Sequence, residues 1–294
     1  MKEACKNFSS CITNYLNGNT ETFRIKYWEK TKKKKVIEIE KASIKGSLLN
    51  FLKEIKCTYN KEDYKINNES TIMIHCDVDL RKYTLLVCEK VFLEDKSEND
   101  DTTGIDVGIR TFLTCFNNNE IIEIGHDFRE NIKKHLDKID KINANNEVKN
   151  KSKAIRKQYT IIKNIVDEMH WKSIKFLTDR YGQIIIGKMN IKEIVNKRNK
   201  KITNETKRIG LLMRHGDFLK RLEYKCAIKQ KNLVIVNEKY TSGTCSGCGF
   251  FKKDLGGAQL YNCNRRGLKI GRDIHSARDM NIVGIKEPSN EEIY

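Results

Sequence analysis

From residue 103 onward, short apolar runs alternate with long segments of helical periodicity. Four apolar runs predict strands, the first two joined by the turn NNN: 103–116, 120–125, 181–189 and 232–240. Apolar residues spaced by three and four predict a helical hairpin over 127–180, and the second half of the basic segment 196–231 is an amphipathic helix by pattern. Because strands connected through helices pair in parallel, this order predicts an α/β domain whose later strands run parallel to its first.

A different pattern precedes this domain. Short β-branched runs alternate with polar turns, as is typical of a small β-rich module: 36–46, 70–80 and 83–93. Residues 1–35 are polar and have no clear period, and the hydrophilic segment 94–102 is the expected boundary. We therefore predict two domains, 1–100 and 101–294, with an insert at about 240–270 in the second.

The charge of the chain indicates its class of partner. Among 294 residues, 57 are Lys or Arg and 39 are Asp or Glu, which gives a formal net charge of +18. Such an excess concentrates polyanions, so nucleic acid is the first partner to expect. The sequence has neither the apolar core of a signal peptide nor a run that could span a bilayer. We therefore expect a soluble, intracellular protein with reduced cysteines, of which Cys88 and Cys226 read as core residues.

Three acidic residues lie where function gathers in such a sheet, near the carboxyl ends of strands. Asp106 lies between glycines in GIDVG, Glu238 follows the run LVIVN, and Asp273 leads a predicted C-terminal helix in GRDIHSARD. An aspartate within an apolar strand is costly to bury unless it is paired or binds a cation, and flanking glycines leave room for close approach. Taken alone, the GxDxG pattern also fits a turn aspartate.

Carboxylates from separate segments are what two divalent cations need. Mg²⁺ prefers oxygen ligands, and a pair of such ions acts on both the attacking and leaving oxygens of a phosphodiester. The residues alone thus predict a magnesium site made of Asp106, Glu238 and Asp273, and a metal-dependent nuclease.

The insert between the second and third acids contains a cysteine pattern. Cys245 and Cys248 form a Cys-x-x-Cys, and Cys263 follows 15 positions later, as in a zinc ribbon. A fourth ligand is expected near position 266, which is Arg266. Two interpretations stay open: zinc held by three thiolates with an outside ligand or water, or loss of the metal.

Several segments together resemble one protein family. The segments TGIDVGIRTFLT, QIIIGKMNIKEIV, KRIGLLMRHGDFLKRLEYKC, VNEKYTSGTCSGCG and YNCNRRGLKIGRDIHSARDMNI resemble, in order over about 103–285, the transposon-encoded TnpB proteins, and more closely their eukaryotic and large-DNA-virus branch, the Fanzor proteins. The resemblance implies an RNase H-like (RuvC) nuclease domain that cuts double-stranded DNA under a guide RNA. Residues 36–93 fit loosely the β-rich wedge domain of those proteins.

The resemblance also assigns roles to residues. Asp106 matches the first catalytic aspartate and Asp273 the last, whereas Gly187 stands where TnpB proteins place a glutamate. Fanzor proteins carry a glutamate just before YTS instead, a place that Glu238 occupies. A move to the neighbouring strand is expected to shift the carboxylate by about 4.8 Å. Glu193, in IKEIV, is the reserve candidate.

The chain departs from the family pattern at several places. Arg266 replaces the fourth zinc cysteine, and His275 and Asp279 stand where the family usually has asparagines. His275 is expected at the surface, with a phosphate contact or a proton relay as alternatives. The N-terminal part is short for the helical lobe that supports the guide–target duplex.

Three basic residues lie on the predicted helix before the Glu238 strand: Arg214, Arg221 and Lys225. They are candidate phosphate contacts, and solvated helix charge is the competing interpretation.

The leading functional hypothesis is an RNA-guided DNA endonuclease in the nucleus or in the cytoplasm of a virus-infected host. The alternatives are an inactive, element-encoded nucleic-acid-binding protein and a guide-independent RNase H-like nuclease.

Overall fold

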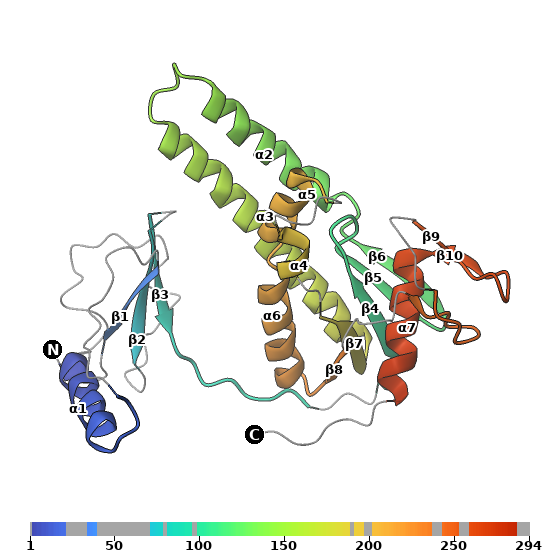
Figure 1. Ribbon diagram of the computed structural model, residues 1–294, viewed down its shortest axis with the longest axis horizontal. Coiled ribbons are helices and arrows are strands. Elements are labelled where there is room, and N and C mark those ends of the chain that lie inside the picture. The colour runs from blue at the N-terminus through green and yellow to red at the C-terminus, as the bar shows by residue number, and fades with distance from the viewer. Residues whose placement is uncertain are drawn as a thin grey trace. The chain divides into compact units, whose positions relative to one another are not determined.

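The structure is a computed structural model, which describes residues 2–21, 34–39, 71–78, 81–95, 99–188, 191–196, 202–236, 243–252 and 259–286. Contacts divide the chain into two compact units, residues 1–89 and 90–294 (Figure 1). The break between the units falls at residue 89, before the hydrophilic segment that begins at residue 94.

The described part of the first unit contains a helix and a three-stranded antiparallel sheet (Figure 1). Its elements are α1 (Lys2–Leu16), β1 (Lys34–Ile39), β2 (Ile72–Asp77) and β3 (Lys82–Val87). The sheet has the order β1-β2-β3, and Ile39 and Ile72 form its small buried core. The predicted β-rich character is confirmed, with shorter strands than the runs indicated; residues 40–46 lie outside the described part of the chain.

Two features of this unit differ from the sequence-based expectation. Helix α1 lies in the segment 1–35, for which the sequence predicted no element, and its Phe8, Tyr15 and Leu16 are exposed. The prediction of Cys88 as a core residue is wrong: it follows the last strand and is exposed, whereas Cys226 is buried as predicted. An apolar neighbourhood in sequence does not bury a residue that lies beyond the end of its sheet.

The second unit is built on a five-stranded mixed sheet with the order β6-β5-β4-β7-β8. Its strands are β4 (Thr102–Val107), β5 (Leu113–Asn117), β6 (Glu120–Ile124), β7 (Gln183–Gly187) and β8 (Asn232–Val236). Strands β4, β7 and β8 run parallel, while β5 and β6 are antiparallel neighbours on one side. The predicted α/β class and the parallel later strands are confirmed.

The run 103–116 is two strands, not the single strand predicted. The chain turns after β4, where the Gly108 N–H donates to the Phe112 carbonyl at 3.1 Å. A Cβ atom at position 108 would lie 2.5 Å from the Thr111 carbonyl oxygen, so this tight turn needs glycine. The apolar residues on both sides of the turn concealed it, because both belong to central strands.

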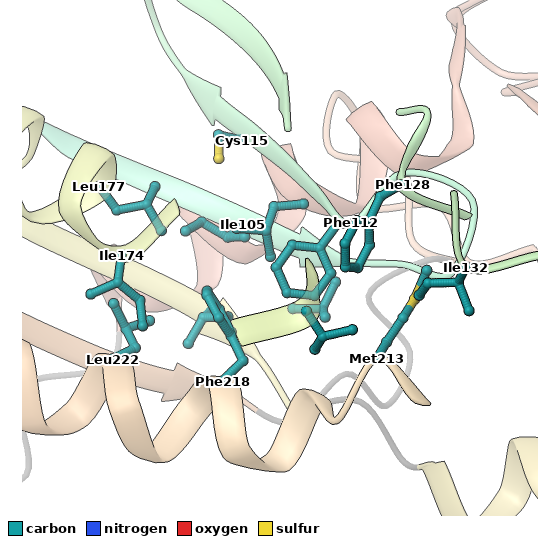
Figure 2. Close-up of a cluster of buried hydrophobic side chains, with 14 of the residues drawn as sticks. Ile105, Phe112, Cys115, Phe128, Ile132, Ile174, Leu177, Met213, Phe218 and Leu222 are labelled. Carbon is teal, nitrogen blue, oxygen red and sulfur yellow. The ribbon is translucent and has the colours of Figure 1, made fainter. Parts of the chain in front are cut away.

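Helices cover one face of the sheet and contribute most of the buried apolar residues (Figure 1). They are α2 (Phe128–Ala144), α3 (Lys151–Arg180), α4 (Ile191–Val195), α5 (Asn204–Leu212) and α6 (His215–Ile228). Figure 2 shows Ile105 of β4 in one cluster with Leu177 of α3 and Phe218 of α6. The α2–α3 hairpin is confirmed, and Ile132, on its predicted apolar stripe, is fully buried.

The opposite face carries one helix, α7 (Arg272–Lys286), which packs on β4, β5, β7 and β8. Ile185 of β7, Val236 of β8 and Met280 of α7 form a separate small core there. Between β8 and α7 the chain forms the cysteine module, which we define as residues 243–252 and 259–271. It includes β9 (Leu260–Asn262) and β10 (Lys269–Gly271).

Candidate metal centres

Asp106 is the penultimate residue of β4 and belongs to the face that α7 covers. Two residues earlier, a Cβ atom at Gly104 would lie 2.3 Å from the Ala277 carbonyl oxygen and 2.5 Å from the Asn281 nitrogen, both of α7. Side chains alternate along a strand, so position 106 projects to the same side as position 104, and Ile105 projects into the helical core. The prediction that these glycines leave room for close approach is confirmed at Gly104.

Asp273 lies in the first turn of α7 and is 34% exposed. Arg110, from the turn that follows β4, places its Nη2 atom 3.4 Å from both carboxylate oxygens of Asp273. Arg110 is four residues beyond Asp106, so this contact ties the first turn of α7 to the carboxyl end of β4. Arg110 was not predicted as a site residue. The sequence feature that could have indicated it is its place in the loop directly after the strand that carries Asp106.

The predicted third carboxylate, Glu238, lies outside the described residues. In the β7–β8 ladder Gly187 pairs with Val236, which is two residues before position 238 in the sequence. The place of the Glu238 carboxylate at the site stays a prediction.

The three predicted cysteine ligands are brought together. The sulfur atoms of Cys245, Cys248 and Cys263 all lie within 4.8 Å of one another, with 3.6 Å between Cys248 and Cys263. Among the described residues, this is the only group of three or more Cys, His, Asp or Glu side chains close enough to share a metal ion. Thiolates at this spacing fit a zinc ion in the chemistry of their donor atoms.

Two turns of the same backbone geometry present these cysteines. In the first, the Cys245 N–H donates to the Phe250 carbonyl at 2.9 Å, and the Gly249 N–H donates to the Cys245 carbonyl at 2.8 Å. Gly249 has a φ of +69°, in the left-handed region that favours glycine.

The second turn repeats each of these features. The Cys263 N–H donates to the Leu268 carbonyl at 2.9 Å, the Gly267 N–H donates to the Cys263 carbonyl at 2.8 Å, and Gly267 has a φ of +64°. Backbone N–H groups of Arg266 and Arg265 hydrogen-bond the Cys263 sulfur and lower the pKa of this thiol to about 7. Stabilising the thiolate in this way favours metal binding.

The cysteine module joins α7 through a buried histidine. His275 stacks on Tyr261 of β9 with 3.8 Å between ring centroids, and its Nε2 atom lies 3.4 Å from the Ser246 N–H, which donates to it. His275 is fully buried, so the predicted surface position is wrong. Its place two residues after Asp273 means that the module packs against the turn of α7 that carries that carboxylate.

Asp279 shares this buried region. Its Oδ2 atom lies 3.3 Å from His275 Nδ1, and neither atom has a hydrogen-bond partner of good geometry in the described structure. Burial lowers the pKa of His275 to about 4, with the Arg278 charge adding to the effect, and burial raises the pKa of Asp279 to about 7. Desolvation thus outweighs ion pairing, and near pH 5.5 both side chains are uncharged.

The predicted phosphate contacts on α6 have partners within the protein. Arg214 and Arg221 both contact Asp167 Oδ1, at 2.5 Å and 2.6 Å, and Arg221 also lies 3.1 Å from His170 Nδ1. Burial alone would raise the pKa of Asp167, but the hydrogen bonds from these two arginines hold it below its usual value. These contacts favour a structural role for both arginines.

Lys225 is also paired, though at a more open position. Its Nζ atom lies 3.4 Å from Glu94 Oε1, with side-chain exposures of 30% and 52%. The Glu94 N–H donates to the Ile228 carbonyl at the end of α6, so this segment is fastened to the helix. Phosphate contact by Lys225 stays a prediction.

Among the described residues, no helix has both the length and the apolar character needed to cross a bilayer.

Comparison with known proteins gives a consistent picture. Residues 74–198 match a family model described as a probable transposase, and residues 215–280 match a Cas12f1-like TNB domain. Two TnpB-like proteins of Acanthamoeba polyphaga mimivirus are each 33% identical over 96% of this chain. The chain spans only 56% and 55% of their lengths. A solved Cas12f1–sgRNA–target DNA complex is similar at 17% identity and a TM-score of 0.49, over 74% of this chain and 46% of that one. In sequence, the chain is therefore similar to TnpB-like proteins over nearly its whole length.

Proposed function

We propose that the second unit is an RNase H-like (RuvC) nuclease domain that hydrolyses DNA phosphodiesters under a guide RNA. The observation that carries the proposal is the backbone contact of α7 with β4 at Gly104. It supports a site in which Asp106 and Asp273 lie on one face of the sheet, near the carboxyl end of β4. The order of the mixed sheet is consistent with the fold that the resemblance implies.

The donor atoms of this site suit magnesium. Asp106 and Asp273 would hold it through carboxylate oxygens, which this hard cation prefers. Bound magnesium would supply charge stabilisation to both the attacking and the leaving oxygens of the scissile phosphodiester. The Arg110 guanidinium, which contacts both oxygens of Asp273, would have to share or release this carboxylate when magnesium binds.

We propose Glu238 as the third carboxylate. Val234 and Val236 pack on the α7 face of β8, and Glu238 continues the same alternation in the sequence. Gly187, which pairs with Val236, offers no side chain at the place where TnpB proteins carry their glutamate. Glu193 of α4 stays the reserve candidate.

We assign the three-cysteine cluster to zinc, in a ribbon-type module inserted between β8 and α7. The described module has few apolar residues, so cross-linking by metal would supply the stability that its small core cannot. Because His275 packs against the module, its order would in turn keep Asp273 in place.

The proposed partners are a guide RNA and double-stranded DNA. A net charge of +18 supports binding to polyanions, and the family supports a guide RNA. We propose the first unit as the wedge-type nucleic-acid-binding domain. Because the chain spans about half of its relatives, cleavage by this chain itself is the point to test.

The test is to purify the chain with the RNA it retains, sequence that RNA, and offer a matching DNA duplex with Mg²⁺. We expect cleavage that EDTA abolishes and that Asp106→Asn lowers by at least about 10³-fold. The matched control is Asp127→Asn, at the start of α2, where the carboxylate is 92% exposed and should leave the rate unchanged.

The absence of a carboxylate at Gly187 favours one alternative, a binding protein that no longer cuts. That function predicts the same retained RNA and salt-sensitive DNA binding without Mg²⁺-dependent products. Retained RNA without cleavage would therefore replace our proposal with this alternative, and cleavage without RNA would indicate a guide-independent nuclease.

A further inference from the structure

The two cysteine turns correspond position by position, and at one position a cysteine in the first turn corresponds to an arginine in the second. Cys245, Gly249 and Phe250 of the first turn correspond to Cys263, Gly267 and Leu268 of the second, with two hydrogen bonds and the glycine conformation in common. The turns differ in one bond: the Cys248 N–H donates to the Cys245 carbonyl at 3.2 Å, whereas the Arg266 N–H donates to the Cys263 sulfur. Cys248 of the first turn therefore corresponds to Arg266. The second turn has kept the backbone that presents two ligands, although it supplies only one.

Arg266 lies beside the cysteine cluster and is exposed. A Cβ atom placed on Gly247 of the first turn would lie 3.8 Å from the Cys245 sulfur and 3.9 Å from Cδ of Arg266. The aliphatic part of Arg266 thus reaches the first turn next to a ligand sulfur. Cys245 and Cys263 are buried and Cys248 is half-buried, whereas Arg266 is exposed, so the side of the cluster next to Arg266 is open to solvent.

We propose that this is an open zinc site, in which three protein thiolates leave a fourth position, beside Arg266, for a small anionic ligand such as a free thiolate. The inference rests on the zinc assignment proposed above. Zinc with three thiolates carries a net charge of −1, and a fourth thiolate would make it −2. The Arg266 guanidinium offsets the charge that the incoming ligand adds.

Such a site differs from a closed structural one. Structural zinc sites have four protein ligands, whereas sites with three protein ligands keep an exchangeable position. The intact second turn makes a sharp prediction about repair. A cysteine at position 266 would meet the backbone that Cys248 meets in the first turn, so it should complete the tetrahedron without remodelling the loop.

The experiment replaces zinc by Co²⁺, whose visible spectrum reports the number of thiolate ligands. We expect the wild-type chain to show a three-thiolate spectrum that shifts toward four thiolates when 2-mercaptoethanol is added as the probe. Arg266→Cys should show the four-thiolate spectrum at once, ignore the probe, and bind Co²⁺ at least about tenfold more tightly. Arg265→Cys is the matched control, because Arg265 lies over the Phe250 ring instead, and it should behave as wild type.

Circular dichroism on each metal-loaded variant separates altered ligation from misfolding. A four-thiolate spectrum in the wild type, no response to the probe, or an Arg265→Cys spectrum equal to that of Arg266→Cys would each overturn the proposal. So would a wild-type chain that binds no Co²⁺. The measurement uses no nucleic acid, so failure of DNA cleavage would leave it unaffected, and its failure would leave the carboxylate site untouched.

Discussion

The sheet and the cysteine module both position candidate metal ligands, but their hydrophobic cores differ greatly in size. Among the residues that the structure describes, the main core of the sheet unit contains 21 buried residues, whereas the core of the module contains three, of which two are the cysteines Cys245 and Cys263. The sheet can therefore hold Asp106 in place without any metal, because apolar burial stabilises it. If the module binds zinc as proposed, it depends on that metal for order, and this difference should be visible in how each region responds to perturbation.

Metal removal should produce the largest difference between the two regions. Binding of a structural zinc ion is worth on the order of 10 kcal/mol, so a strong chelator should unfold residues 243–252 and 259–271 while β4 and α3 stay folded. Hydrogen exchange read peptide by peptide would measure this. Cys245→Ser should reproduce the effect of the chelator, and Cys88→Ser, at an exposed cysteine, should not. Loss of protection in both regions together would show that they form one cooperative unit.

Gly104→Ala should destabilise the sheet unit. The new methyl group would lie 2.3 Å from the Ala277 carbonyl oxygen, which is backbone and cannot swing away, so α7 must shift. We expect a loss of about 3 kcal/mol in the free energy of unfolding, measured by urea denaturation. The control is Gly216→Ala in α6, where nothing lies within 4 Å of the added atom and stability should hold or rise slightly.

The two regions also differ in how far the sequence predicts them. The cysteine cluster follows from spacing, because Cys245 and Cys248 belong to one turn and need no knowledge of the fold. The parallel pairing of β4, β7 and β8 follows from the alternation of apolar runs with helices. The break at Gly108 did not follow, because both strands beside it are central and apolar.

Contacts between distant segments could not be predicted from the sequence. The β7–β8 register, which aligns Gly187 with Val236, depends on how the whole sheet assembles. The partners of Arg214 and Arg221 come from α3, some 50 residues earlier, so a basic helix face looked free when it was not. His275 is buried for the same reason, since Tyr261 of the module covers it.

Asp279→Asn tests the buried region where α7 meets the cysteine module, and its effect on the free energy of unfolding should depend on pH. The pKa of Asp279 is raised from 3.8 to about 7 in the folded state, so its contribution to folding is fully present below about pH 4 and is lost as pH rises through 7. Asparagine cannot ionise and so removes this penalty. We expect the variant to gain about 2 kcal/mol over wild type between pH 5 and pH 8. Equal curves for both chains over that range would place the carboxyl group in contact with water.

Arg221→Gln should cause a small loss of stability in the sheet unit and should not change the stability of the cysteine module. Its guanidinium contacts Asp167, which keeps Arg214 as a second partner, so we expect a loss of about 1 kcal/mol confined to the sheet unit. Lys225→Gln is the control, because its pair with Glu94 is longer and more exposed and should cost less than about 0.5 kcal/mol. RNA retention measured across a salt series decides between structure and recognition. The baseline for RNA binding is Lys172→Gln, at an exposed lysine of α3 that pairs with Glu168. If Arg221→Gln weakens RNA binding more than Lys172→Gln does, with the module still protected from exchange, Arg221 binds phosphate after all. An equal effect of Arg221→Gln and Lys172→Gln would confine Arg221 to joining α3 with α6.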